Sequence, residues 1–543
     1  MRLYDLGGRA VHHDESLHGY FAHQLFIGNG YDHNPLMHGM FQFYSIATSF
    51  FLVGDSDFSL RLSMAVFGTA LVLVPLLLRP RIGQVGALIA AFMLAFSPSM
   101  LYFSRFARND IFMAVFALAL VGVMWRYIDE RKHRWLYIGA GLVAIGFTTK
   151  ETMYIVVALL MAYLATQVWR EIRDWLYARR TLSEFSPTAS FLLLLGTLIL
   201  PLLAAGAAIF QSTLGITLAA EDGLPGVATG SPNGAGWPVA IGISAALLAA
   251  ALLLGWYWKR RVFLGAWAIF AAVFVLLFTG FGSNPGGVGS GAWQSLGYWL
   301  AQQDVARGNQ PWYYYFTLGA IYEFLPFAVA GAATIYYGFK SGFRPWVLVL
   351  TFAAGMAVLA NDTLSFERGI VQGTEQDVST IVGKLALLAV YGSAIAIPFV
   401  LRTSKINRFL IFWTIGTFIA YTQAGEKMPW LLVNVSLPAI ILAAKALNDV
   451  VMSIDWPNAV RSKVGFALVG VPIFYSLLWK IVFQDLGAGG RQFASAWAIL
   501  AGLGLLLLGL QVLASRIGRS QALGVVGLVT AVLLFGLTFR AGW

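Results

Sequence analysis

The stretch LRLSMAVFGTALVLVPLLL, residues 60–78, decides the fold of this chain. Apart from Arg61 it carries no charge, and it is long enough to cross a hydrocarbon core of about 30 Å as a helix. Of the 543 residues, 59% are hydrophobic and only 11% are charged, whereas about a quarter of the residues of a soluble domain are charged. The strand-like alternation of a membrane β-barrel is absent. The sequence therefore predicts an all-α polytopic membrane protein.

Apolar runs of similar length recur to the C-terminus, and every second connection between them is rich in Lys and Arg. The basic connections are expected on the cytoplasmic side of the plasma membrane, so the other face is extracytoplasmic. Residues 36–53 are interpreted as a juxtamembrane helix in the interface. The sixteen predicted spans are 60–78, 84–103, 111–127, 135–149, 152–169, 190–210, 237–258, 262–281, 313–338, 345–360, 384–401, 408–423, 430–448, 464–482, 496–515 and 522–539.

This pattern divides the chain into three regions. Residues 1–59 form an outer catalytic loop, residues 60–210 an N-terminal transmembrane core, and residues 211–543 a C-terminal transmembrane region with outer loops 211–236, 282–312 and 361–383. No polar segment reaches the roughly 50 residues that a soluble domain needs. The net charge of +11 is explained by basic cytoplasmic loops rather than by nucleic-acid binding. Because there is no cysteine, disulfides, thiol nucleophiles and thiolate metal sites are excluded.

The polar chemistry is concentrated in RAVHHDESLHGYFAHQLFIGNGYDHNPLMH, residues 9–38, which holds six of the seven histidines. Asp14 and Glu15 lie side by side among these imidazoles on the predicted outer face. Such a group suits a general base, and it also suits a divalent cation. The alternative is a hydrated interfacial loop, in which polar residues cost little.

Two further outer segments carry charges suited to a phosphate. In RFARND (residues 105–110), Arg105 and Arg108 are three apart and are expected to converge on one anion, with Asn109 as the N-cap of the next helix and Asp110 in support. The alternative is two arginines that extend toward water at the membrane surface. TTKET (residues 148–152) places Lys150 and Glu151 on a very short outer turn, which is otherwise a polar hairpin tip.

Three late features complete the outer face. GEKMPW (residues 425–430) has Lys427 with Glu426 at the membrane boundary, and a flexible ammonium suits a phosphate head group. QPWYYYF (residues 310–316) is typical of an aromatic belt, although aromatic side chains also bind sugars or prenyl chains. Glu323 lies about two turns deeper, where an ionisable group usually faces a polar cavity.

The combination of HHDE, RFARND and EKMPW resembles the GT-C membrane glycosyltransferases that use lipid-phosphate sugars. These include the protein O-mannosyltransferases of family 39 and the aminoarabinose transferases, and the likeness is closest to the prokaryotic flippase-activity-associated protein family. It covers roughly residues 2–165 and then the PWYYY and EKMPW segments. The resemblance implies a GT-C helix bundle, a polyprenyl-phosphate sugar donor, and an acceptor hydroxyl on a lipid, protein or glycan. It also implies a membrane helix ahead of the catalytic loop, so either the natural chain starts before Met1 or that helix is supplied otherwise.

By this resemblance, Asp14 with Glu15 beside it is the base of an inverting displacement. Arg105, Arg108, Lys150 and Lys427 would stabilise the leaving lipid phosphate, and Asp110, Glu151, Glu323 and Glu426 would support the site. No cofactor is required by the sequence. A divalent metal bound by Glu15 with some of His12, His13, His18, His33 and His38 stays an open alternative, although the spacing matches no fixed signature such as HExxH. The alternative function is a lipid-linked sugar transporter, a flippase or a flippase-associated subunit that uses the same phosphate site without chemistry.

Overall fold

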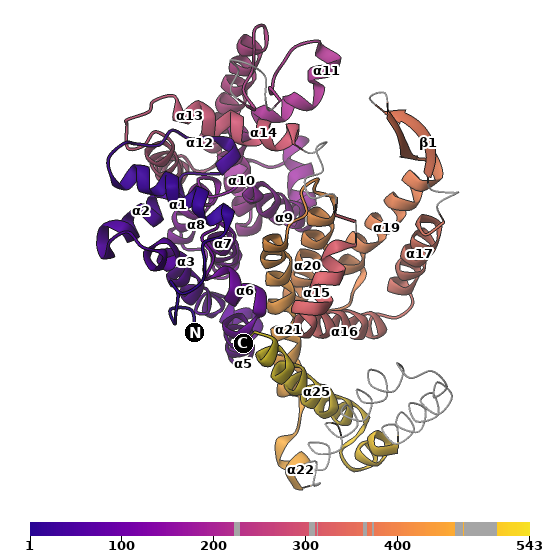
Figure 1. Cartoon of the computed structure of the whole chain (residues 1–543). Helices are drawn as coiled ribbons and strands as arrows, with labels where there is room; N and C mark the ends of the chain where they lie inside the picture. Colours follow the sequence, from indigo (N-terminus) through magenta and orange to yellow (C-terminus); the bar gives the residue numbers. More distant parts are fainter. Residues whose placement is uncertain are drawn as a thin grey trace.

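The computed structural model describes residues 1–221, 229–302, 310–311, 313–361, 366–371, 374–461, 471 and 508–542, and most of them are helical (Figure 1). The first half contains α1 (His13–Phe26), η1 (Pro35–Met37), α2 (Phe41–Val53), α3 (Asp57–Leu71), η2 (Val74–Leu78), α4 (Arg79–Ile82), α5 (Gln84–Phe96), α6 (Pro98–Phe103), α7 (Asp110–Glu130), α8 (Arg134–Phe147), α9 (Thr152–Leu176), η3 (Leu182–Glu184), α10 (Pro187–Ile199), η4 (Leu200–Phe210), α11 (Gln211–Leu214) and α12 (Gly236–Phe278). The second half contains α13 (Gly287–Gly289), η5 (Ser290–Gln294), α14 (Ser295–Ala301), α15 (Tyr314–Tyr322), α16 (Phe324–Lys340), α17 (Arg344–Leu359), β1 (Phe366–Val371), β2 (Thr374–Ser379), α19 (Ile381–Val400), α20 (Lys405–Gln423), η7 (Pro429–Leu431), α21 (Leu432–Ser453), α22 (Trp456–Arg461) and α25 (Arg519–Gly542).

Eight helical stretches in the described part of the chain are long and apolar enough to cross a membrane, and the bent pair α15 and α16 would make a ninth. The predicted multi-pass helical architecture is confirmed, whereas the predicted number of sixteen spans is not reproduced. Helices α8 and α17 have only 14 and 16 residues. The two spans expected at 237–258 and 262–281 form the single helix α12, whose backbone leaves helical geometry at Lys259. The span predicted at 464–482 and much of that at 496–515 lie outside the described residues.

The predicted outer loops contain short elements. Helices α1 and α2 have 14 and 13 residues, too few to cross a membrane, in agreement with the expected juxtamembrane helices. Within 361–383 the polar sequence forms an antiparallel hairpin in which β1 pairs with β2. This hairpin stands apart from the N-terminal helices at the upper right of Figure 1. It is the only β structure in the described residues.

Helices α7 and α21 are the most deeply buried of the candidate spans. Helix α7 packs against α3, α8 and α21, and α21 packs against α5, α16 and α20. The RFARND segment leads directly into α7, and the EKMPW segment leads into α21. The two central helices therefore fix the positions of two of the segments singled out from the sequence.

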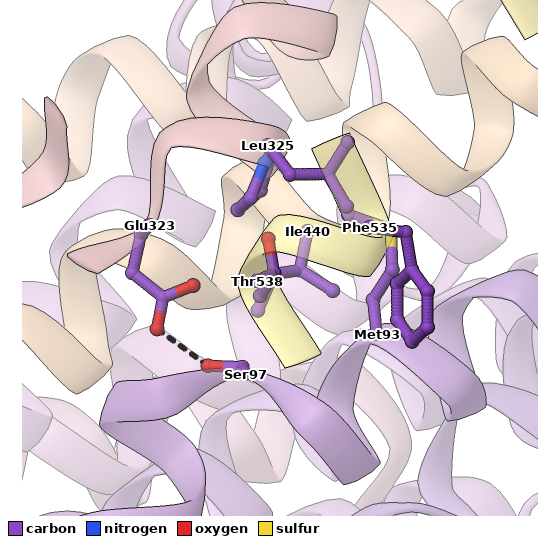
Figure 2. A pocket seen from close by; sticks show the side chains of 8 residues that line it. Met93, Ser97, Glu323, Leu325, Ile440, Phe535 and Thr538 are labelled. Atoms are coloured by element: carbon purple, nitrogen blue, oxygen red, sulfur yellow. Dashed lines mark hydrogen bonds between the residues drawn. The ribbon is translucent and has the colours of Figure 1, made fainter. Parts of the chain in front are cut away.

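Two helices are broken at points that touch each other (Figure 2). Helices α5 and α6 are separated at Ser97, and Pro98 cannot donate a helical hydrogen bond to the preceding turn. Helices α15 and α16 meet at Glu323 with a bend of 108°, three residues before Pro326. The Glu323 carboxylate accepts hydrogen bonds from Ser97 and Ser99, which joins the two breaks.

Candidate active site

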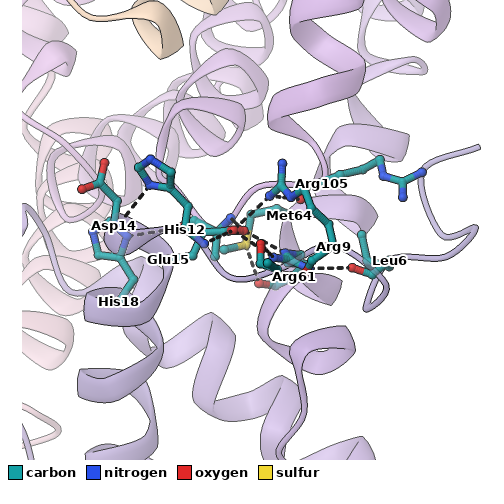
Figure 3. Close-up of polar contacts among 12 residues, drawn as sticks. Leu6, Arg9, His12, Asp14, Glu15, His18, Arg61, Met64 and Arg105 are labelled. Atoms are coloured by element: carbon teal, nitrogen blue, oxygen red, sulfur yellow. Dashed lines mark hydrogen bonds and ion pairs between the residues drawn. The ribbon is translucent and has the colours of Figure 1, made fainter. Parts of the chain in front are cut away.

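Glu15 is a buried structural anchor rather than an exposed base. Its side chain has no exposed surface and forms two hydrogen bonds with the equally buried Arg61, at 2.8 and 2.9 Å. It also accepts from Arg9 and from the backbone N–H groups of His12 and Ala107 (Figure 3). Burial alone would raise the pKa of Glu15, but these donors outweigh it and hold the pKa below its usual value. Glu15 thus fixes the start of α1 against α3 and the RFARND segment.

Asp14 points the other way, toward the rest of the polar cluster. Its side chain is 23% exposed, and its Oδ2 accepts from Nη1 of Arg108 at 2.5 Å. Adjacent residues of a helix point about 100° apart, so the two neighbouring carboxylates reach different partners. Of the two carboxylates predicted as catalytic, only Asp14 is partly exposed to solvent.

Arg108 lies between two carboxylates and an aromatic ring. Besides Asp14, it has Asp110 at 3.6 Å from Nε, and its guanidinium carbon lies 3.7 Å from the ring centroid of Trp430. Its side chain is only 7% exposed. An arginine held by two carboxylates and an aromatic face is well placed to exchange one carboxylate for a phosphate.

Arg105 does not join Arg108. Its guanidinium donates to the backbone carbonyls of Met1 and Asp5, and it points away from Asp14 in Figure 3. Residues 104–109 form a turn rather than a helix, so the spacing of three does not place the two arginines on one face. The expected convergence of these arginines is therefore not seen. Asn109 occupies the N-cap position of α7 without capping it, and its Nδ2 donates to the carbonyl of Thr149.

The TTKET turn docks on the RFARND segment. Nζ of Lys150 donates to Oδ1 of Asp110 at 2.8 Å, and both side chains are almost fully buried. The backbone of residues 39–41 donates to the carbonyls of Thr148 and Thr149. A Cβ atom on Gly39 would lie 2.1 Å from the carbonyl oxygen of Thr148, so this approach requires glycine. Lys150 is thus engaged by Asp110, and the TTKET turn joins the RFARND segment to residues 39–41.

His38 and Glu151 form a further pair of oppositely charged residue types in the same cluster. Nδ1 of His38 lies 2.6 Å from Oε2 of Glu151, and the imidazole is 19% exposed. Burial would raise the pKa of Glu151, but the neighbouring His38 outweighs it and keeps the pKa below its usual value. His38 has a left-handed backbone with φ of 65°, a conformation that costs a non-glycine residue about 1–3 kcal/mol. Such strain is tolerated where the surrounding structure fixes the residue, as it often does at functional sites.

The other candidate metal ligands are dispersed. Nδ1 of His18 bonds the carbonyl of Ala107, Nδ1 of His33 bonds Ser290, and Nδ1 of His12 accepts from the backbone of Asp14. Burial lowers the pKa of His18 to about 3 and that of His33 to about 4. His13 is exposed at the start of α1. Within the described residues, no three His, Asp or Glu side chains come together as a metal-binding group. The histidines considered as metal ligands therefore do not gather around Glu15.

The late motifs meet the early ones at Trp430. Oη of Tyr315, from the PWYYY segment, bonds both the carbonyl and the N–H of Met428. This contact holds the EKMPW loop where Trp430 reaches Arg108. Lys427 and Glu426 are half-buried on the same loop, and burial lowers the pKa of Lys427. Glu323 bonds Ser97 and Ser99 instead of joining this cluster.

Sequence reasoning missed three residues that build the site. Arg61 was read only as part of an apolar span, although a lone cation in such a span usually signals a buried carboxylate partner. Trp430 and Tyr315 were read as interface aromatics, and neither the contact of Trp430 with Arg108 nor the anchoring of the loop by Tyr315 has a local sequence signature.

Residues 37–191 match the family model described as dolichyl-phosphate-mannose-protein mannosyltransferase. This part of the chain carries the sequence pattern of that family. The matched range includes His38, Arg108, Asp110, Lys150 and Glu151, and it begins after Asp14. The predicted resemblance to lipid-phosphate glycosyltransferases is confirmed over this range.

A curated relative agrees with the family match. The Bacillus subtilis (strain 168) protein named "Putative mannosyltransferase YkcB" is 31% identical over 125 residues, which is 22% of this chain. The aligned region spans only 18% of that relative.

Two solved structures are also similar. One is ArnT from Cupriavidus metallidurans bound to undecaprenyl phosphate, with 14% identity, 99% of this chain and 75% of that chain covered, and a TM-score of 0.41. The other is the Archaeoglobus fulgidus oligosaccharyltransferase in the apo form, with 14% identity, 95% of this chain and 52% of that chain covered, and a TM-score of 0.43. Both TM-scores lie below 0.5, so no functional conclusion follows from either likeness.

Proposed function

We propose that this protein is an integral-membrane glycosyltransferase that moves a sugar from a polyprenyl-phosphate donor to an acceptor hydroxyl. The family match over residues 37–191 supports the reaction class. The observation that carries the proposal is the partly exposed Asp14 bonded to the nearly buried Arg108. One group can accept a proton and the other can bind a phosphate, and they are in direct contact.

The contact between Asp14 and Arg108 favours a reaction in which Arg108 exchanges the Asp14 carboxylate for the donor phosphate. The donor phosphate takes the place of Asp14 at Arg108, with Trp430 supporting the guanidinium from its face. Asp14 is then free to accept a proton. Donor binding and release of the base are thereby coupled through one arginine.

The chemical step follows from this arrangement. The acceptor hydroxyl oxygen attacks the anomeric carbon while the bond from that carbon to the phosphate oxygen breaks. The proton of the hydroxyl passes to Asp14, and the electron pair of the broken bond leaves on the phosphate, opposite Arg108. Attack from the face opposite the leaving group inverts the anomeric configuration. No step is assigned to a metal, because the described residues assemble no ligand set.

The active face is assigned to the outside of the plasma membrane. The connections between spans that are rich in Lys and Arg lie on the opposite side from the cluster in the predicted topology. Arg131 and Lys132, for example, lie between α7 and α8, at the far end of α7 from Asp110. The acceptor belongs to the lipids, proteins or glycans that are available on the outer face.

The test compares Asp14→Asn with Arg108→Ala in purified full-length protein supplied with a prenyl-phosphate sugar. Asp14→Asn removes the base and should lower the transfer rate by about 10²-fold or more. Because asparagine competes less well for Arg108, donor affinity should stay the same or rise. Arg108→Ala should instead weaken donor binding by about 1.5–3 kcal/mol, the range for a hydrogen bond to a charged group.

The matched control is Asp32→Asn, which changes an exposed aspartate in the same N-terminal stretch. This variant should keep the wild-type transfer rate and donor affinity. Wild-type transfer rates in the Asp14→Asn variant would contradict the proposal. Movement of the intact donor across vesicles by the wild-type protein, with the glycosyl bond unbroken, would replace it with the transporter function.

A further inference from the structure

Glu323 is a buried carboxylate in which only one of the two oxygens accepts hydrogen bonds from the described residues. Its side chain has no exposed surface. Oε1 accepts from the hydroxyls of Ser97 and Ser99, both at 2.5 Å, and from the Ser99 N–H at 2.9 Å. Oε2 has no hydrogen-bond partner among the described residues. All of the donors thus converge on one oxygen, and the other is left for a different ligand.

The second oxygen points into a small cavity, on the side where Thr538 lies (Figure 2). The apolar part of the wall is formed by Met93, Leu325, Pro326, Ile440 and Phe535. These residues come from α5, α16, α21 and α25, so the cavity lies where four helices meet. The space holds roughly one water-sized species, which excludes an organic head group.

The charge at this position lacks a protein partner. No described cationic side chain forms an ion pair with Glu323 or acts on it electrostatically. An ionised carboxylate in an apolar interior is stabilised by a cation more effectively than by hydroxyl donors. A positive ligand of atomic size would satisfy both the charge and the shape of the cavity.

Other oxygen atoms are available around the same point. The hydroxyl of Thr538 lines the cavity with that of Ser97. Carboxylate and hydroxyl oxygens are ligands that hard cations prefer.

We propose that Glu323 binds one small monovalent cation, for which Na⁺ is the probe. A single carboxylate favours a single positive charge, and Glu323 belongs to no group of three acidic or histidine side chains in the described part of the chain. The ion would connect the break between α5 and α6, the break between α15 and α16, and α25, through Ser97, Glu323 and Thr538 respectively. This site is independent of the proposed transfer reaction.

The experiment measures thermal unfolding of the full-length protein in detergent by tryptophan fluorescence, in NaCl and in choline chloride at equal ionic strength. Wild-type protein should unfold at a temperature about 2 °C or more higher in NaCl, with a saturable dependence on Na⁺. Glu323→Gln preserves shape, so it should fold, lose the response to Na⁺ and unfold at the same temperature in both salts. Glu184→Gln, an exposed control far along the chain, should keep the full response.

A second variant keeps the test decisive if Glu323→Gln does not fold. Thr538→Val preserves shape and removes one hydroxyl, and it should raise the Na⁺ concentration for half-maximal response about tenfold. Equal unfolding temperatures of the wild-type protein in the two salts would overturn the proposal, because Glu323 would then hold only a proton. A Na⁺ response that persists unchanged in Glu323→Gln, or in Thr538→Val when Glu323→Gln does not fold, would place the ion elsewhere and would also overturn it.

Discussion

Replacing Glu15 by glutamine separates a structural carboxylate from a catalytic one. The carboxylate receives five hydrogen bonds, two on Oε1 from Arg61 and Ala107 and three on Oε2 from Arg61, Arg9 and His12. Whichever oxygen becomes the amide NH₂ of glutamine will face at least two donors. Losing two charge-assisted bonds at about 1.5–3 kcal/mol each gives about 3–6 kcal/mol of lost stability. That range agrees with the 3–5 kcal/mol typical of breaking one side of a buried ion pair.

The assay is a double-mutant cycle with Glu15→Gln, Arg61→Met and the double variant, followed by thermal unfolding in detergent. Arg61 retains the carbonyls of Leu6, Arg9 and Ala10 as acceptors, so its isolated charge is partly compensated in Glu15→Gln. We therefore expect a loss nearer 3 kcal/mol for this variant. The double variant should lose less than the sum of the two by about 2 kcal/mol or more.

Activity then decides the role of Glu15. Folded Glu15→Gln protein should transfer sugar at a rate close to wild type, since the chemistry is assigned to Asp14. Glu221→Gln, at an exposed position, is the control for the loss of a glutamate charge. A Glu15→Gln variant that is as stable as wild type but inactive would refute this reasoning and would make Glu15 part of the reaction.

Three other predictions follow from the same geometry. Trp430→Leu removes an aromatic face 3.7 Å from the guanidinium carbon of Arg108, a contact worth about 0.5–2 kcal/mol, so donor affinity should fall roughly 2- to 30-fold with little change in kcat. Burial lowers the pKa of His18 to about 3, so below about pH 6.5 the unfolded state binds a proton that the folded state does not. The free energy of unfolding should therefore fall by about 1.4 kcal/mol per pH unit as the pH drops below this value. His18→Gln should remove this part of the acid sensitivity in unfolding measurements. In the cysteine-free chain, a membrane-impermeant thiol reagent should label His13→Cys from outside and leave Lys132→Cys unlabelled, and the reverse pattern would invert the assigned orientation.

The sequence was sufficient for features that depend on local composition. Apolar runs predicted the membrane helices, although the connection expected between residues 258 and 262 is a local break at Lys259 within α12. The segments around Asp14, Arg108, Lys150 and Trp430 were all identified as parts of one outer site, and their side chains are linked through Arg108 and Asp110.

What the sequence could not supply is the direction of individual side chains. Asp14 and Glu15 are neighbours with the same charge, and only the position of Arg61, 46 residues away, distinguishes them. Arg105 and Arg108 have helical spacing, yet their segment is a turn, so the spacing does not predict a shared face. His38 and Glu151 are separated by 113 residues, and their contact depends on how two loops dock. Such pairings are tertiary, and no local pattern encodes them.

From the charges around Arg108, we expect donor binding to be accompanied by uptake of a proton. Without counting His38, which contacts Glu151, Arg108 and Lys150 supply two positive charges, and Asp14, Asp110 and Glu151 supply three negative ones. A phosphate added to this cluster increases the excess of negative charge in a poorly solvated place, and a proton bound at the same time offsets the repulsion.

His38 is the imidazole in contact with this cluster, with Nδ1 lying 2.6 Å from Oε2 of Glu151. Calorimetric titration of the donor in buffers of different ionisation enthalpy should therefore show uptake of about 0.5–1 proton at neutral pH. His38→Gln keeps a donor to Glu151 but removes the imidazole, so loss of the buffer dependence in this variant would identify His38 as the group that takes up the proton. Equal binding enthalpies in all buffers for the wild-type protein would show that the phosphate enters without a proton, and the exchange of partners at Arg108 would then need a different compensating charge.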